Sequence, residues 1–207
     1  GVFLNALSGT YAYVKQHRVY FKAAIPFAIA TLPGAILGSL VSDYFTGPTF
    51  SLSYGIFILI ISAIMYWNSS NKKAIATNFN ETLFIARKKL GIILSMFVGF
   101  ISSIFGIGGG IIHVPVMIYA LAFPPHMATA TSHFVLAVSS FMGVTSHIFL
   151  NHIVWIPALA VGFGAVIGAQ IGARLSKKTK PRSIILLLCI SLFLLGIRMI
   201  VESNLLF

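Results

Sequence analysis

The chain has 207 residues, of which 58% are hydrophobic and only 8% are charged, and its formal net charge is +11. About a quarter of the residues of a soluble globular domain are charged. This chain has too few charged side chains to cover a surface in water, so its composition excludes a soluble domain. Lipid is therefore the solvent for most of the chain. We predict an all-α, polytopic helical membrane protein.

Apolar stretches follow one another along the whole chain, and about 20 residues suffice to cross a bilayer. They cover residues 1–14, 23–42, 51–67, 90–123, 127–150, 153–174 and 183–201. The first is shorter than the others, and the chain begins inside it at Gly1. We therefore interpret the sequence as a fragment or as one with a misplaced start.

The stretch 90–123 is too long for a single span. It runs for 34 residues without a charge and is interrupted by Gly106-Ile107-Gly108-Gly109-Gly110. As one helix it would be about 50 Å long, against a hydrocarbon core of about 30 Å. Clustered glycines also make a poor helix interior. We predict two shorter helices that form a re-entrant hairpin broken at the glycines.

The distribution of positive charge supports this hairpin. Lys and Arg gather between the apolar stretches, in segments 15–22, 68–89 and 174–182. If residues 90–123 crossed once, the last two segments would face opposite sides, against the retention of basic loops in the cytoplasm. With a hairpin all three share one side. Membrane orientation explains the net charge, so nucleic acid is not an expected partner.

A constant offset of 134 residues relates the two halves of the chain. It pairs Gly9 with Gly143, Gly34-Ala35 with Gly168-Ala169, Gly38 with Gly172, Ser42 with Ser176, and Met65 with Met199. Segment 15–22 and its counterpart 149–156 lie on opposite sides, which makes the repeats inverted, a plan found in secondary transporters. We expect residues 1–67 to be an incomplete first repeat whose N-terminal hairpin is missing. Residues 68–89 would be a cytoplasmic basic loop, and residues 90–207 the second repeat.

The glycine break is the first candidate binding site. Gly108, Gly109 and Gly110 would open the backbone, which a membrane tolerates only inside protein or beside a wet cavity. A helix that starts after Gly110 would aim its free N–H groups and positive dipole end at an anion, with Pro115 in its first turn. The alternative is a kink for helix packing. A dinucleotide loop is disfavoured, because G-x-G-x-x-G needs a glycine where Ile111 stands.

Polar side chains after the next turn form a second candidate. Thr131 and Ser132 are positioned to donate hydrogen bonds to an oxyanion at membrane depth. Equally, such hydroxyls bridge helices. His133 and His113 are candidates for proton coupling, because histidine titrates near physiological pH; a neutral, hydrogen-bonded packing role is the alternative.

Two motifs place small residues along one helix face: Gly34-x-x-x-Gly38 and Gly164-x-x-x-Gly168-x-x-x-Gly172. Close approach of neighbouring helices explains both, so neither needs a substrate.

Few residues could support catalysis. The only acids are Asp43, Glu81 and Glu202, and Glu202 is expected to pair locally with Arg198. The single Cys189 stands in an apolar run and is expected to be a buried, small apolar side chain. The sequence has no metal-ligand spacing and no nucleophile–base constellation. We expect no enzyme activity, no metal and no cofactor.

Taken together in their order, these motifs resemble the TauE/SafE-type sulfite exporter permease family. The resemblance rests on Gly106-Ile107-Gly108-Gly109-Gly110, His113-Val114-Pro115-Val116, Ala130-Thr131-Ser132, the run from Gly164 to Ala173, Leu7-Ser8-Gly9-Thr10, and Leu32-Pro33-Gly34-Ala35 with Gly38. It implies a bacterial-type permease of the inner membrane that moves sulfite, a sulfonate or a related anion, usually outward. It also implies a glycine box in the first half, which this chain lacks.

The expected function is a secondary transporter, acting as an exporter, of sulfite, sulfonate or a related small organic anion. An anion channel or a non-transporting membrane scaffold subunit is the alternative. The expected location is the inner cell membrane, with multiple passes. The expected partners are a small anionic solute and the lipid bilayer, and a homo-oligomer is left open. The anion, the direction and the coupling ion are not specified by these residues.

Overall fold

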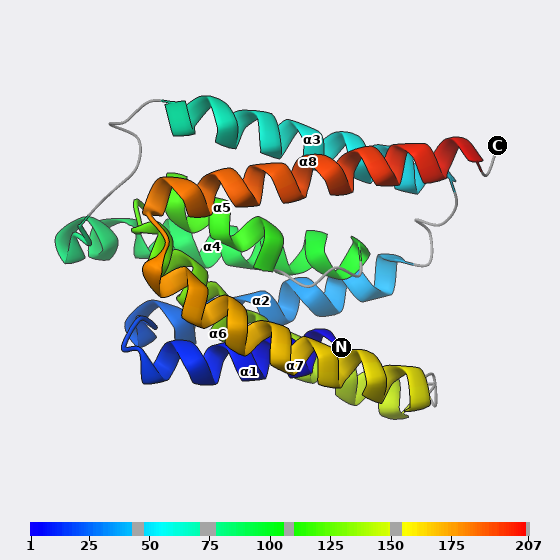
Figure 1. Ribbon diagram of the computed structural model, residues 1–207, viewed down its shortest axis with the longest axis horizontal. Helices are drawn as coiled ribbons and strands as arrows, with labels where there is room; N and C mark the ends of the chain where they lie inside the picture. The colour runs from blue at the N-terminus through cyan, green and yellow to red at the C-terminus, as the bar shows by residue number, and fades with distance from the viewer. Residues whose placement is uncertain (43–47, 71–77, 106–109, 150–154, 206–207) are drawn as a thin grey trace.

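The computed structural model describes residues 1–42, 48–70, 78–105, 110–149 and 155–205. In these ranges the chain forms helices and no strand (Figure 1), which confirms the all-α prediction. The helices are α1 (Val2–Lys15), α2 (Phe21–Ser42), α3 (Pro48–Ser70), α4 (Glu81–Phe105), α5 (Gly110–Tyr119), α6 (Pro125–Phe149), α7 (Trp155–Lys178) and α8 (Pro181–Leu205). Four of these described helices, α2, α3, α7 and α8, are long and apolar enough to cross a membrane.

The long uncharged stretch forms two helices, α4 and α5, as its length and glycines predict. Helix α4 begins earlier than expected, at Glu81, so the end of segment 68–89 is helical. Asn80 explains this start, because its side-chain Oδ1 accepts a hydrogen bond from the Leu83 N–H at 3.0 Å and caps the helix. Glu81 in the first turn also complements the positive helix end.

The basic segments gather at one end of the bundle, where the chain leaves α1, enters α4 and leaves α7. Hydrogen bonds join them there: Arg18 to Ser176 (3.1 Å), Lys22 to Glu81 (2.7 Å) and Arg87 to the Ala120 carbonyl (2.8 Å). A single crossing by residues 90–123 would have placed two of these segments at opposite ends. The geometry therefore agrees with the charge argument for a hairpin.

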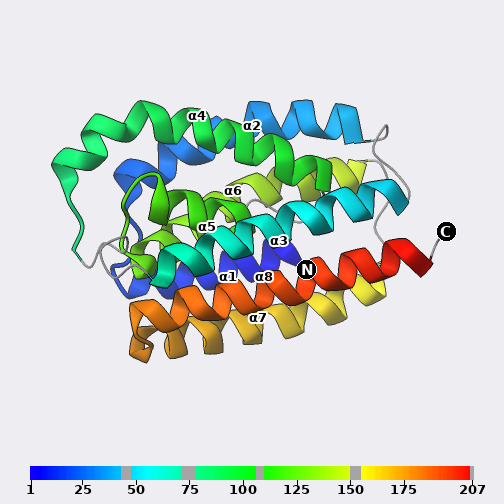
Figure 2. The ribbon, with the colours of Figure 1, turned by 90° about the horizontal axis from the view of Figure 1, so that it is seen from above.

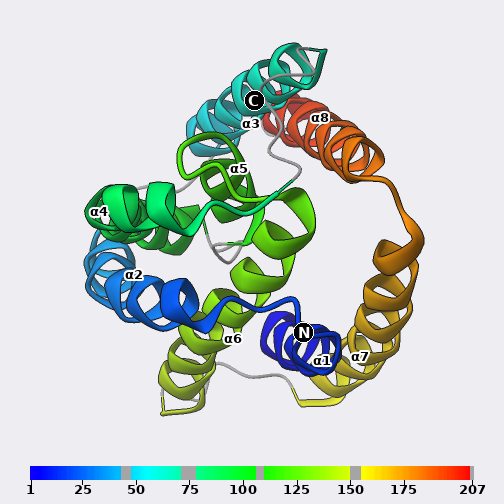
Figure 3. The ribbon, with the colours of Figure 1, turned by 90° about the vertical axis from the view of Figure 1, so that its left-hand side faces the viewer.

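The helices run nearly along one axis and pack in pairs (Figure 2). Helix α2 lies along α4, and α3 lies along α8, while α1 contacts both α6 and α7. Seen end-on in Figure 3, α5 lies inside the ring that the other helices form, beside α4 and α6. The short helix is thus surrounded by protein.

Glycines set the closest helix contacts. A Cβ atom at Gly34 would collide with the Met96 carbonyl oxygen, and one at Gly38 with the Phe100 carbonyl oxygen. From the other side, a Cβ at Gly99 would collide with the Thr31 carbonyl oxygen. Close approach of α2 and α4 is therefore confirmed as the role of the Gly34-x-x-x-Gly38 motif.

The second small-residue motif behaves differently: the described chain makes no close helix contact there. Nothing lies within 4 Å of a Cβ built at Gly164, Gly168 or Gly172. Helix α7 contacts α1 through other positions, since the Ser8 hydroxyl donates to the Val166 carbonyl at 3.0 Å. No helix in the described chain covers the glycine face of α7.

Two local expectations are confirmed. Arg198 pairs with Glu202 one helical turn later, at 2.8 Å between Nε and Oε1. Cys189 is a free, buried side chain in the contact between α8 and α3, where the Ser62 hydroxyl donates to the Cys189 carbonyl at 2.9 Å.

At the basic end, hydrogen bonds from Lys22 and Tyr20 hold the pKa of the exposed Glu81 carboxyl below its usual value.

The α2–α4 contact gives a first testable prediction. Gly34→Leu should lower the melting temperature of the purified protein in detergent strongly, because overpacking against backbone atoms costs about 1–3 kcal/mol or more. Leu37→Phe, on the exposed side of the same helix, is the matched control and should change the melting temperature little. Equal melting temperatures for Gly34→Leu and the unmodified protein would contradict the close contact.

Candidate functional site

The break between α4 and α5 returns the chain to the end from which it came. The Arg87 guanidinium, near the start of α4, donates to the carbonyl of Ala120, just after α5. A Cβ at Gly91 would likewise lie 3.1 Å from a methyl group of Leu121. The two helices are therefore antiparallel. Of the three glycines predicted to open the backbone, Gly108 and Gly109 lie outside the described residues, and Gly110 is the first residue of α5.

Helix α5 is half the length of a membrane span. Its 10 residues rise about 15 Å, against a core of about 30 Å. Because Tyr119 lies near the basic end, Gly110 lies near the middle of the bundle. The first N–H groups of α5 have no partner within their own helix, and the positive end of its dipole lies at this depth, where Gly110 is half-buried.

Pro115 does not occupy the first turn of α5, as we expected, but its sixth position. Even a helix that started at Ile111, directly after the glycines, would place Pro115 at its fifth position, past the first turn. A proline at this position removes one backbone hydrogen bond inside a helix of only 10 residues. It therefore loosens α5 and does not cap it.

His113 is the polar centre of the hairpin. Its ring is 1% exposed, and its Nε2 lies 3.0 Å from the Ser95 hydroxyl of α4, while Nδ1 lies 3.2 Å from the Ser132 hydroxyl of α6. The Ser95 hydroxyl already donates to the Gly91 carbonyl at 2.7 Å, so it accepts from the Nε2–H of His113. The His113 ring thus joins α5 to α4 through Ser95 and to α6 through Ser132.

Among the described residues, two buried hydroxyls have no hydrogen-bond partner, that of Thr10 on α1 and that of Ser102 on α4. The Ser102 side chain is 7% exposed. It lies on the same face of α4 as Ser95, which is seven residues earlier. Because Ser95 is level with His113, helix geometry places Ser102 about 6 Å beyond Gly110 along the bundle. The free N–H groups of α5 point in that direction.

The hydroxyls of Thr131 and Ser132 bridge helices in this structure. Thr131 accepts a hydrogen bond from the Tyr20 N–H at 3.2 Å, and Ser132 contacts His113 as well as the sulfur of Met117 at 3.3 Å. Both residues are at most 1% exposed. The interpretation of these residues as helix bridges therefore describes the observed contacts.

His133 packs on α1 and stays apart from the His113 cluster. A Cβ at Gly9 would lie 2.6 Å from the His133 ring, and the Tyr13 ring meets it edge-on at a centroid distance of 5.2 Å. Its Nδ1–H donates to the Thr129 carbonyl of its own helix at 3.2 Å. These contacts match the packing role, and proton coupling by His133 stays a prediction.

A separate polar cluster stands at the basic end, around Arg18. Its guanidinium contacts the side chains of Gln16 (3.1 Å), Ser176 (3.1 Å) and His126 (3.1 Å). Partial burial lowers the pKa of the Arg18 side chain, which nonetheless stays charged. The cluster joins the α1–α2 connection to α6 and α7, and so connects the two halves of the chain.

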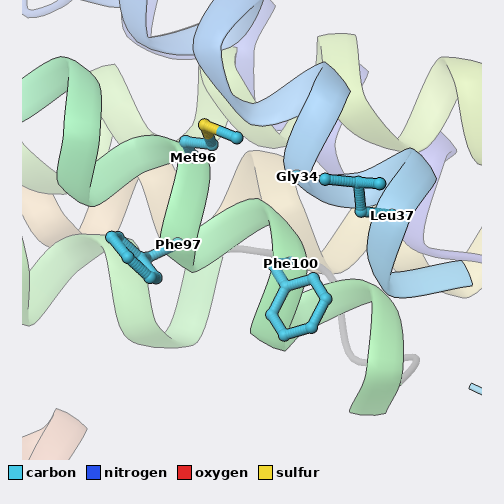
Figure 4. A pocket seen from close by; sticks show the side chains of 5 residues that line it. All are labelled: Gly34, Leu37, Met96, Phe97 and Phe100. Atoms are coloured by element: carbon cyan, nitrogen blue, oxygen red, sulfur yellow. The ribbon is translucent and has the colours of Figure 1, made fainter. Parts of the chain in front are cut away.

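A groove on the outside of the α2–α4 pair is a poor candidate for an anion. It measures about 220 Å³ and is shown in Figure 4. Gly34, Leu37, Met96, Phe97 and Phe100 line it. These residues offer no side-chain donor, and Phe97 is 61% exposed. The groove is apolar, so a lipid chain suits it better than a charged solute.

The chain is similar to known membrane transporters over nearly its whole length. The family model described as "Sulfite exporter TauE/SafE" matches residues 1–199. A "Probable membrane transporter protein YunE" of Bacillus subtilis is 34% identical, over 98% of this chain and 78% of that protein. A "Probable membrane transporter protein" of Xylella fastidiosa is 27% identical, over 86% of this chain and 67% of that protein. No solved structure gives a significant match.

The chain therefore belongs to the sulfite exporter TauE/SafE family, as its motifs indicated. It is a multi-pass membrane protein of the transporter class, with four described helices able to cross a bilayer. The relatives are named as transporters, not as enzymes.

The His113 cluster gives a second prediction. Ser95→Ala should lower the free energy of unfolding by about 1–3 kcal/mol, because it leaves the buried His113 Nε2–H without an acceptor. Thermal unfolding followed by circular dichroism measures the change. Ser140→Ala is the matched control, since the Ser140 hydroxyl only donates back to its own helix, to the Leu136 carbonyl at 2.6 Å. If both variants unfold at the same temperature, the cluster does not hold α5.

Proposed function

We propose that this chain forms part of a secondary transporter that exports a small oxyanion, namely sulfite, a sulfonate or a related organic anion. The anion binds at the N-terminus of α5. The family supports a membrane transporter, and the chemistry of the break supports a negatively charged solute. Exposed N–H groups and a positive helix end favour an anion, and transporters use such broken helices near the membrane midplane.

One observation carries this proposal: the buried Ser102 hydroxyl has no hydrogen-bond partner in the described structure. The rise of α4 from Ser95 is what supports placing it beyond the first residue of α5. A buried polar group without a hydrogen-bond partner lowers the stability of the folded protein by about 1–3 kcal/mol, unless water or a solute forms the missing bond. Ser102 would donate to the oxyanion, together with the first N–H groups of α5, which starts at Gly110. All these donors are neutral, so the anion is held without a strong ion pair and can leave again.

The other predicted residues take supporting roles in this proposal. Gly108 and Gly109, which lie outside the described residues, keep their predicted role of opening the backbone beside the anion. Thr131 and Ser132 are expected to shape the site, through the bonds that fix α5 and the α1–α2 connection. Pro115 keeps α5 adjustable, which suits a helix that must release its ligand.

The test is transport by purified protein in liposomes. Ser102→Ala should raise the KM for labelled sulfite several-fold, because one of the few donors to the anion is lost. It should leave the melting temperature unchanged or slightly higher, since no hydrogen bond within the protein is lost. The matched control is Ser139→Ala, whose hydroxyl donates only to its own helix.

Counterflow decides the class of protein. Labelled sulfite should accumulate transiently in liposomes preloaded with unlabelled sulfite, as a carrier requires. A channel shows flux without counterflow, and a scaffold subunit shows neither. If sulfite shows no counterflow while taurine or another sulfonate does, the proposed binding site is still supported and the substrate is the sulfonate. If Ser102→Ala leaves the KM of every transported anion unchanged, the site is not at the end of α5.

Proton coupling is a separate prediction. His133→Gln should abolish the stimulation of transport by an imposed pH gradient and leave sulfite counterflow in place, because only the coupling proton is removed. The exposed His17, changed to Asn, is the control. If the pH gradient still stimulates transport by His133→Gln but no longer stimulates transport by His113→Gln, proton coupling belongs to His113.

A further inference from the structure

Arg18 is a half-buried cation that no acid neutralises in the described structure. Its guanidinium contacts neutral groups only, the side chains of Gln16, Ser176 and His126, each at 3.1 Å. Both acids of the described ranges form ion pairs with other residues. Moving a cation out of water costs free energy, so a partly buried cation is normally paired with an anion. The described chain supplies no such anion to Arg18.

Two hydrogen-bond donors of this guanidinium are free in the described structure. An arginine side chain has five N–H donors on one planar group. The contacts with Gln16 and Ser176 use both donors of Nη1, and the contact with His126 uses one donor of Nη2. The Nε–H and the second Nη2–H have no acceptor among the described residues. Such a fork of two donors on neighbouring nitrogens matches two oxygens of an oxyanion.

The surroundings of Arg18 add to the positive potential. Because a guanidinium only donates hydrogen bonds, the Nδ1 of His126 accepts from Arg18, and this contact brings no negative charge. His126 is the second residue of α6, so the positive end of that helix dipole lies beside the guanidinium. Arg174 and Lys177 are exposed on α7, on either side of Ser176. Together these groups attract anions from solution.

The connection between α1 and α2 holds Arg18 in a fixed position. Its N–H donates to the Tyr13 carbonyl at 3.1 Å, across His17, whose left-handed backbone (φ 55°) ends α1. Two residues later, the Tyr20 N–H donates to the Thr131 hydroxyl at 3.2 Å. The backbone is therefore fixed on both sides of Arg18. A ligand at its guanidinium would order little additional chain, which lowers the entropic cost of binding.

This place is separate from the end of α5. His126 lies six residues before Ser132 on α6, a rise of about 9 Å. Ser132 contacts His113, which lies three residues after Gly110, a further rise of about 4 Å. The two rises add, because α5 ends and α6 begins at the basic end. The sites are therefore about 13 Å apart along the bundle, too far for one small anion to contact both.

We infer that Arg18 binds an oxyanion through its free Nε–H and Nη2–H, at a second site on the basic side of the bundle. Basic segments of membrane proteins stay in the cytoplasm, so an exporter meets its anion on this side first. Arg18 holds the anion before it moves to the end of α5. The kind of anion, sulfite or a sulfonate, rests on the proposed function, whereas the site rests on the free donors of Arg18. The phosphate of a lipid headgroup offers the same oxygens, and the experiment separates these two sources.

The test is equilibrium dialysis of labelled sulfite against the purified protein in neutral detergent. The unmodified protein should show two classes of binding site, and Arg18→Gln should lose one of them. Arg182→Gln is the matched control, because it removes the same charge from an exposed position at the basic end, and it should keep both classes. Equal sulfite binding by Arg18→Gln and Arg182→Gln would overturn the inference.

A second variant addresses the structural role of Arg18, which also contacts α6 and α7. Arg18→Lys keeps the positive charge but replaces the fork of donors by one ammonium group, so it should bind sulfite several-fold more weakly at this site. Its melting temperature is measured in parallel to establish that it is folded. If folded Arg18→Lys binds sulfite as tightly as the unmodified protein, the fork does not hold the anion and the inference is wrong.

Vesicles distinguish a free anion from a lipid headgroup. Sulfite binding that depends on Arg18 should persist when the protein is moved from phosphatidylcholine vesicles into vesicles that also contain phosphatidylglycerol. If phosphatidylglycerol abolishes this class of binding and leaves the other class in place, a lipid headgroup occupies the site and the inference fails.

The inference and the proposed function can fail separately. Ser102→Ala should weaken only the class of sulfite binding that Arg18→Gln leaves intact. If Ser102→Ala changes nothing while Arg18→Gln removes one class, the proposed site at α5 is wrong and the Arg18 site is supported. The reverse result overturns the Arg18 site alone.

Discussion

The fold depends on one constraint: a helix that stops inside the membrane must have its ends and polar groups satisfied by protein. Helix α5 spans about half of the core, so its N-terminus cannot reach water at either surface. The structure meets this constraint by surrounding α5 with other helices and by fastening it through His113 to Ser95 and Ser132. These bonds hold the positive helix end in place, and no charged side chain of the described residues lies near it.

Close helix contacts make room for this interior. Glycines bring α2 against α4, and Gly55 of α3 against Gly196 of α8, where a Cβ at either residue would lie 2.9–3.1 Å from the other's carbonyl oxygen. Two helices in lipid gain no hydrophobic free energy when they associate, because lipid is as apolar as the partner helix. The favourable free energy of association must therefore come from close packing of the two backbones. The paired helices form the outer part of the bundle, and the polar cluster lies at its centre.

Much of this arrangement could be predicted from the sequence, because length and charge act over whole segments. The hairpin followed from 34 uncharged residues and from basic segments that had to share one side, and the structure brings Arg87 to Ala120. Single-residue geometry was harder. Ser95 and Ser102 were missed, although serines seven residues apart mark one helix face, because serine is common in membrane helices for other reasons. Pro115 was misplaced because it stands five residues after Gly110, which is already beyond the first turn of a helix that starts there.

The distribution of charge fits the solute proposed for this site. Among the described acids, Glu81 pairs with Lys22 and Glu202 with Arg198, both in exposed positions, so no carboxylate lies near α5 to repel an anion. Apart from Arg198, the basic residues of the described chain lie at one end of the bundle, where they attract anions from that side. The interior then offers hydroxyls and backbone N–H groups instead of a second cation. A full positive charge at the midplane would bind the anion too tightly to release it, whereas neutral donors around a helix end allow both capture and escape.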